Sequence, residues 1–118
     1  MAAMVTRLAI LVLCVGCGGG APPSVRVCND TAYDFNAVAW DTIYAIDFLP
    51  AGSCTDYETP THDVYRYTRV AFRVQTDEFL IQPIDFVGET PLGEGAWSYH
   101  VTITDYATRS ADVEARPD

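Results

Sequence analysis

The chain has 118 residues, 49% of them hydrophobic, and its 16 acidic side chains outnumber 7 basic ones to give a formal net charge of −9. This balance argues against nucleic-acid binding and against electrostatic adhesion to anionic lipid, because both need a surplus of positive charge. The length is enough for one domain with one hydrophobic core.

The N-terminal residues have the three parts of an export signal. Residues 1–7 carry one positive charge, residues 8–15 are apolar, and Gly16 precedes Cys17. The apolar run is too short to span a bilayer as a helix. The segment resembles a bacterial lipoprotein signal peptide, in which the cysteine after the cleavage site receives a diacylglycerol thioether. The resemblance implies a signal peptide at residues 1–16 and a lipid anchor, with acyl chains such as palmitate, at Cys17.

The sequence leaves one alternative open for this segment. Lipoprotein signals usually have Leu three residues before the cysteine, whereas this chain has Cys14, so an ordinary secretory signal cleaved near Ala21 also fits. Residues 17–24 are rich in Gly and Pro, which is typical of a linker between an anchor and a domain. We expect a lipid-anchored extracytoplasmic domain in the bacterial cell envelope. The residue after Cys17 is Gly18 and not the Asp of a retention signal, which favours the outer membrane if the host has two membranes.

Two cysteines remain in the expected mature domain, Cys28 and Cys54. In an exported chain they most simply form a disulfide, since Cys14 leaves with the signal and Cys17 carries lipid. The bond would close a ring of about 26 residues and stabilise the fold by about 3–4 kcal/mol. A zinc site is less favoured because two cysteines and two scattered histidines show no ligand spacing. No metal and no other cofactor is expected.

From residue 25 onward the apolar pattern has a period of two, which predicts strands and no amphipathic helix. Strands are expected at residues 25–29, 35–42, 54–58, 65–75, 79–82, 97–103 and 111–115. Residues 43–48 either continue the second strand or form a separate one. About seven or eight short strands at this spacing predict a single all-β domain, an antiparallel β-sandwich over residues 25–116.

Residues 92–99 have the pattern Leu-x-x-Gly-x-aromatic-x-Tyr. This resembles the start of a late strand in immunoglobulin-like sandwiches, where the leucine closes one end of the core and an aromatic residue holds the preceding loop. With residues 65–67 and 82–89, the pattern also resembles small bacterial cell-envelope lipoproteins of uncharacterised function. The resemblance covers most of residues 25–104. It implies an immunoglobulin-like β-sandwich and an envelope location, and it brings no activity.

The sequence offers no catalytic constellation. His62 lies in a loop with Thr and Pro, His100 lies on the polar face of a strand, and no Gly-x-Ser-x-Gly turn is present. We expect both histidines to be exposed and the protein not to be an enzyme. Asp85 and Glu89 could be drawn as a carboxylate pair, but hydrogen bonds that Asp85 accepts from loop N–H groups are the simpler expectation. A ligand contact at these two acids stays open.

The favoured binding surface is the outer face of the long strand at residues 65–75. Tyr65, Tyr67, Arg69 and Arg73 would project together from it. Aromatic rings and guanidinium groups are typical interface anchors, and rings also stack on sugars. The alternative is a packed outer face on which the arginine stems cover the tyrosine rings.

The predicted function is therefore a non-catalytic binding or structural module. Its partner would be an envelope protein or a polysaccharide, and not a nucleic acid. The alternative is an inhibitor-like module that inserts the loop at residues 84–90 into an envelope hydrolase. An exposed Tyr/Arg face would favour the first function and a protruding loop the second, whereas a cleft joining a histidine to several acids would favour an enzyme.

Overall fold

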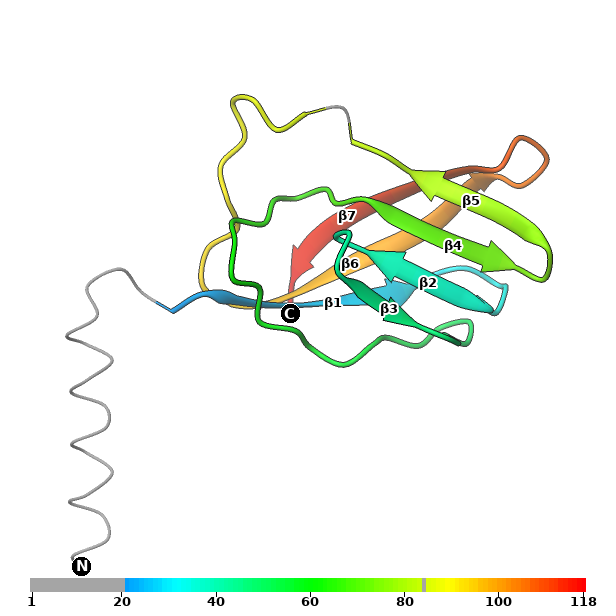
Figure 1. Cartoon of the computed structure of the whole chain (residues 1–118), viewed down its shortest axis with the longest axis horizontal. Helices are drawn as coiled ribbons and strands as arrows, with labels where there is room; N and C mark the ends of the chain where they lie inside the picture. The colour runs from blue at the N-terminus through cyan, green and yellow to red at the C-terminus, as the bar shows by residue number, and fades with distance from the viewer. Residues whose placement is uncertain (1–20, 84) are drawn as a thin grey trace, which may run out of the picture.

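The computed structural model describes residues 21–83 and 85–118, which form seven strands and no helix (Figure 1). In chain order the strands are β1 (Pro23–Asn29), β2 (Ala37–Trp40), β3 (Tyr44–Ile46), β4 (Val70–Val74), β5 (Asp77–Ile81), β6 (Gly95–Asp105) and β7 (Ser110–Pro117). A three-stranded sheet, β1-β6-β7, packs on a four-stranded sheet, β3-β2-β4-β5. The prediction of an all-β sandwich is confirmed. This part of the chain contains no helix that could cross a membrane. The signal peptide and Cys17 lie outside the described residues.

One strand pair departs from the predicted antiparallel arrangement. β1 and β6 run parallel, from Pro23 opposite Gly95 to Asn29 opposite Val101, while every other strand pair is antiparallel. Parallel neighbours need a long crossover connection. The chain provides one, because it builds the whole four-stranded sheet between β1 and β6.

The long strand predicted at residues 65–75 is wrong in its first half, because β4 begins only at Val70. Before that point the chain is held to the other sheet: the Ala115 N–H of β7 donates a hydrogen bond of 2.9 Å to the Arg66 carbonyl. The backbone therefore crosses between the sheets after residue 66. The longest strand is β6 instead.

Three shorter segments either differ from the strands predicted from the sequence or settle an alternative that the sequence left open. Residues 43–48 contain a separate strand, β3, and do not continue β2. Residues 54–58 form only isolated bridges to β1, so the strand predicted there is wrong. The weak strand predicted at residues 111–115 is the longer β7, which pairs with β6 along its length.

The core lies between the two sheets. The first sheet contributes Val25, Val27, Tyr99, Val101, Val113 and Ala115, and the second contributes Val38, Trp40, Val70, Phe72, Val74 and Phe79. The Phe72 ring stacks on Phe35 at 4.1 Å and on Phe79 at 4.7 Å. Full burial of each such side chain contributes about 1.5–3 kcal/mol. The period-two pattern thus identified the inward face of β4 correctly.

Aromatic side chains of β6 hold the loops at one end of the core. The Trp97 ring N–H donates a hydrogen bond of 2.9 Å to the Gly93 carbonyl, and the Tyr99 hydroxyl donates one of 2.7 Å to the Tyr65 carbonyl. Burial raises the pKa of Tyr99 far above its ordinary value, so this hydroxyl keeps its proton. Leu92 is buried in the same end of the core.

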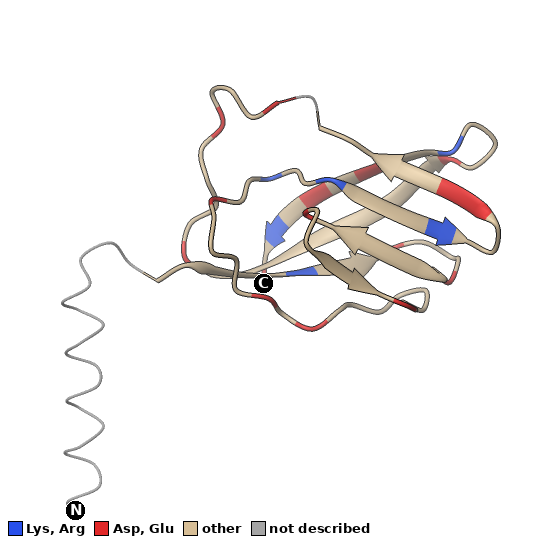
Figure 2. Ribbon diagram, viewed as in Figure 1, with Lys and Arg blue, Asp and Glu red and all other residues tan. Residues whose placement is uncertain are grey.

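Acidic residues are spread over the domain (Figure 2), and two of them form close contacts with tyrosine hydroxyls. Asp77 accepts a hydrogen bond of 2.5 Å from Tyr106 and forms an ion pair with Arg109 at 2.8 Å. Asp118 accepts a hydrogen bond from Tyr57. The tyrosine hydrogen bond is the main cause that lowers the pKa of Asp77, and likewise that of Asp118.

We expect the fold to lose stability in acid through these carboxylates. A carboxylate whose pKa is lowered by folding stabilises the native state above its unfolded pKa and loses that contribution as the pH falls through the lower folded value. Asp77→Asn should therefore be less stable than wild type at about pH 6, and the gap should narrow at about pH 2.5. Urea unfolding at both pH values measures this difference in the free energy of unfolding between the variant and the wild type.

Asp112→Asn is the matched control, because Asp112 forms no ion pair with a described residue. This control should change little at either pH. A gap between Asp77→Asn and wild type that is equal at both pH values would show that the Asp77 charge does not contribute.

Candidate functional site

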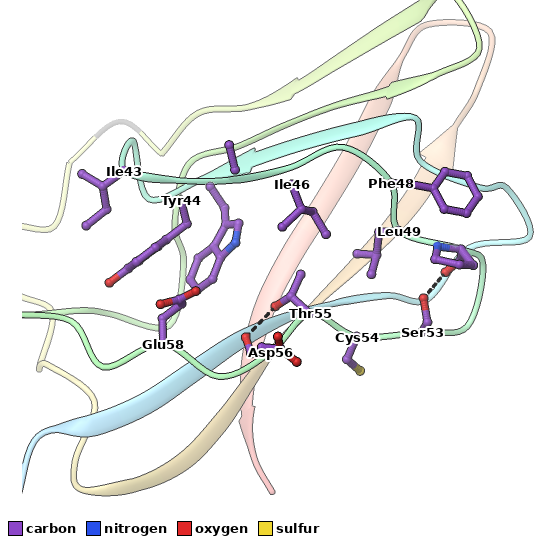
Figure 3. A pocket seen from close by; sticks show the side chains of 13 residues that line it. Ile43, Tyr44, Ile46, Phe48, Leu49, Ser53, Cys54, Thr55, Asp56 and Glu58 are labelled. Carbon is purple, nitrogen blue, oxygen red and sulfur yellow. Dashed lines mark hydrogen bonds between the residues drawn. The ribbon is translucent and has the colours of Figure 1, made fainter.

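A groove of about 590 Å³ lies between the edge strand β3 and residues 53–58 (Figure 3). We call it the β3 groove. Trp40 and Leu49 are buried beneath it, while Ile43 and Phe48 lie at its rim with 60% and 51% of their surface exposed. Exposed apolar side chains gathered around one groove are a common feature of binding sites.

The wall formed by β3 starts from a strained turn. Asp41 and Thr42 both have positive φ, 53° and 58°, a region that a β-branched residue such as Thr disfavours. The turn is held by a 2.9 Å hydrogen bond from the Asp41 N–H to the Arg69 carbonyl. It places Ile43 at the mouth of the groove. Strain of this kind persists only where the surroundings fix it, and it is frequent at functional sites.

The opposite wall, residues 53–58, is attached to the other sheet. Cys54 forms a disulfide with Cys28 of β1, so that prediction is confirmed. Glu58 and Val25 exchange two backbone hydrogen bonds, of 2.7 and 2.8 Å. Since β3 belongs to the four-stranded sheet and this wall is bridged to β1 of the three-stranded one, the groove follows the open seam between the sheets.

One side of β3 has no strand neighbour. Tyr44–Ile46 pair with β2 alone, and no further backbone hydrogen bond joins them to another described residue. An unpaired strand edge can accept an added strand from another chain. The β3 groove therefore has main-chain donors and acceptors beside its apolar side chains.

The groove is acidic at one end. Asp56 and Glu58 line it, and none of the described residues that line it is basic (Figures 2 and 3). Neither carboxylate forms an ion pair with a described residue. Burial is the main cause that raises the pKa of Tyr44, and the carboxylates of Asp41 and Glu58 raise it further. The Tyr44 end is thus acidic, and the Leu49 end is apolar.

The four residues of the predicted Tyr/Arg face do not lie on one strand face, so the prediction that they project together is wrong. Tyr65 and Tyr67 precede β4, because the chain is still held to the other sheet there. The Tyr65 ring stacks on Phe86 at 4.6 Å. Tyr67 lines a separate cavity of about 540 Å³ beside Asp85, with 37% of its surface exposed.

Arg69 and Arg73 do share one side of the chain, on either side of Ala71. Arg69 Nε donates a hydrogen bond of 3.1 Å to Gln82, and Arg73 lies in register with Glu78 on the neighbouring strand. Half of the predicted face is therefore present, on the outer side of the four-stranded sheet and away from the β3 groove.

The two loop acids make contacts within the chain. Asp85 accepts a hydrogen bond of 3.2 Å from the Val87 N–H, and Glu89 lies 3.8 Å from the Arg66 side chain. Between them, Val87 has 89% of its surface exposed at the tip of a turn. Residue 84 lies outside the described residues. The described part of the loop protrudes with an apolar tip.

Each histidine is paired with one carboxylate. His62 lies 2.8 Å from Asp41, and His100 lies 2.8 Å from Asp30. The His62 side chain is 44% exposed and that of His100 is 22% exposed, so only the first is as open as expected. Burial raises the pKa of Asp41, and its contact with His62 partly offsets this. Among the described residues, no group of three or more His, Cys, Asp or Glu is placed to hold a metal ion.

Sequence reasoning missed the β3 groove. Its two walls come from residues 43–49, an apolar run broken by Asp47, and from residues 53–58, of which 54–58 were expected to be a strand. The available signal was the pair of large apolar residues, Ile43 and Phe48, next to a turn-rich segment. That signal does not show which strand lies beside β3.

No protein-family model matches the chain, and no curated protein matches it. The NMR structure of a protein from Eubacterium rectale is similar, with a TM-score of 0.49 and 15% sequence identity over 85% of this chain and 91% of that one.

Proposed function

We propose that this protein is a lipid-anchored component of the bacterial cell envelope whose sandwich is a non-catalytic binding module, with the β3 groove as its binding site. One observation carries the proposal: within the described part of the chain, an unpaired strand edge, exposed apolar side chains and two carboxylates without ion pairs meet in one groove. Such a site binds by main-chain hydrogen bonds and side-chain pockets and needs no reactive group.

The location rests on two features. The signal pattern at residues 1–16 and Cys17 supports export and lipidation, with the outer membrane as the destination if the host has two. The Cys28–Cys54 disulfide supports an oxidising, extracytoplasmic compartment. The immunoglobulin-like assignment belongs to the same proposal, and the buried Leu92 and the Trp97 bond to its preceding loop support it.

The groove favours a protein partner over a polysaccharide, because the β3 edge offers main-chain hydrogen bonds to another backbone. Its carboxylates and the net charge of −9 disfavour nucleic acid.

A second candidate function is the inhibitor-like module, and the protruding loop favours it. Val87 is 89% exposed at the loop tip, and the loop base is braced by the Tyr65–Phe86 stack. A braced loop with an apolar tip can enter the cleft of a hydrolase at a small entropic cost, because its backbone needs little further ordering.

Capture of a partner from envelope extract separates these functions. The bait is full-length protein purified from membranes in mild detergent. Ile43→Asn and Phe48→Asn should each remove most of the captured partner, since interface anchors often weaken binding by about 30-fold or more when truncated. Both side chains are largely exposed, so stability should change by less than about 0.5 kcal/mol.

Leu80→Asn is the matched control, because Leu80 is 54% exposed on another surface. It should retain the partner, and so should Val87→Asn. Loss with Val87→Asn alone would contradict the groove and support the inhibitor-like function. Retention by all four variants would overturn both functions.

The lipid anchor gives a separate expected result. Labelled palmitate should enter the wild-type protein but not Cys17→Ser, and the variant should leave the membrane fraction. The reason is that the thioether to Cys17 would be the membrane attachment. Cys14→Ser serves as the control and should be labelled like wild type. A mature protein that begins with a free amino group near Ala21 would contradict the anchor.

A further inference from the structure

We propose that the β3 groove binds an extended segment of a partner protein that adds to β3 as an antiparallel strand and carries an apolar residue two positions before a Lys or Arg. This inference rests on the proposed function and names the chemistry of its partner.

The backbone of β3 sets the binding mode. Tyr44–Ile46 leave one edge without a strand neighbour, and all pairs in their sheet are antiparallel. An added strand continues the twist and hydrogen-bond pattern of such a sheet, and antiparallel pairs are the commoner kind. The incoming segment therefore has one residue opposite Ile46 (the Ile46 level) and, two residues later in its sequence, another opposite Tyr44 (the Tyr44 level).

The side chains of β3 decide which residues of the segment face the groove. Tyr44 and Ile46 are half-buried and pack against the core, whereas Ala45 between them is exposed on the outer side of the sheet. Side chains of neighbouring strands at the same level lie on the same face. Alternate residues of the segment therefore enter the seam, one beside Ile46 and one beside Tyr44.

The two levels differ in chemistry (Figure 3). Leu49 is buried near the Ile46 level, and Phe48 is exposed at the rim on that side, so an apolar residue fits there. At the Tyr44 level the side chain of Glu58 points toward Tyr44 from the opposite wall, and Asp56 lines the same wall. A carboxylate beside an aromatic ring, with a second carboxylate further along the same wall and no ion pair from either to a described residue, suits a cationic side chain.

Charge also argues against a second copy of this chain as the occupant. A β3–β3 pairing would bring two acidic grooves together in a protein whose net charge is −9. It would also offer no Lys or Arg, because β3 reads Tyr-Ala-Ile. A cationic segment of another protein removes both difficulties.

The test uses ¹⁵N-labelled full-length protein in detergent and an acetylated, amidated peptide, Thr-Val-Thr-Arg-Thr. The amides of Tyr44, Ala45, Ile46 and Glu58 should shift in a saturable way. The same peptide N-methylated on alternate residues keeps its charge but loses the strand hydrogen bonds, and it should not shift them. A peptide with Glu in place of Arg, and one with Val and Arg exchanged, should bind at least several-fold more weakly.

Glu58→Gln should weaken the binding of Thr-Val-Thr-Arg-Thr by roughly tenfold, because the substitution removes a charge-assisted contact. Glu78→Gln is the matched control, since Glu78 is an exposed acid on β5, away from the groove, and it should bind like wild type. Equal binding of the N-methylated peptide would overturn strand addition and leave only charge attraction.

No shift with any peptide, or a concentration-dependent shift of the β3 amides without peptide, would also overturn the inference. An absence of shifts would favour a polysaccharide as the ligand. Shifts that depend on protein concentration alone would favour a second copy of this chain. Neither would affect the capture experiment, in which loss of the partner with Ile43→Asn tests the proposed function by itself.

Discussion

Replacement of both Cys28 and Cys54 by Ser should lower the free energy of unfolding by about 3–4 kcal/mol. The two residues are 26 apart in sequence, and their bond ties residues 53–58 to β1. Without it the unfolded chain regains the entropy of a long ring. A domain of this size should then melt at least about 10 °C lower.

Thermal unfolding with and without a reductant checks this expectation. The reductant should lower the melting temperature of the wild type to that of the double variant and should not affect the double variant. Two thiols that alkylate freely in native protein from the envelope would contradict the bond. A melting temperature unchanged by reduction would show that the Glu58–Val25 backbone hydrogen bonds hold this wall without it.

Asn29→Ala should cost about 2–4 kcal/mol. Asn29 is fully buried, and its side-chain amide donates hydrogen bonds of 2.7 Å to the Tyr33 carbonyl and 3.0 Å to the Leu49 carbonyl. Its carbonyl oxygen accepts the Thr31 N–H at 3.0 Å. Alanine would remove all three bonds and leave the Thr31 N–H without its acceptor, whereas the Tyr33 carbonyl keeps the Thr31 hydroxyl and the Leu49 carbonyl keeps the Phe35 N–H as donors.

Urea unfolding of the variant measures this cost. Asn36→Ala is the comparison, because Asn36 is exposed and accepts one hydrogen bond, from the Gln75 N–H at 2.5 Å. Its loss should be about 1 kcal/mol. Equal losses in the two variants would show that the buried network at Asn29 contributes no more than one exposed bond.

The sequence by itself determined which side of most strands is inward. Val70, Phe72 and Val74 alternate with polar or small residues and are buried, as the period-two pattern predicts. The disulfide followed from counting cysteines in a chain expected to be exported. The burial of Asn29 could not be predicted, because the sequence does not show that the carbonyls of Tyr33 and Leu49 meet its amide.

Only the tertiary structure decided where β4 begins. Residues 65–75 alternate as one long strand would, but the Arg66 carbonyl bonds to β7, far along the chain, and the backbone must cross between sheets before Val70. Tyr65 and Tyr67 are thereby separated from Arg69 and Arg73. The local alternation of apolar residues does not show where the backbone crosses between the sheets. A single long strand and a crossing would keep the same apolar residues inside.

The β3 groove is also a product of tertiary structure alone. A period of two assigns each side chain to a face, but it does not say which strands are neighbours or which edge stays unpaired. Those depend on pairings between segments far apart in the chain: β1 beside β6, β2 between β3 and β4, and residues 53–58 fastened to β1. The open seam between β3 and that wall arises because the two segments, although close in sequence, are hydrogen-bonded to opposite sheets.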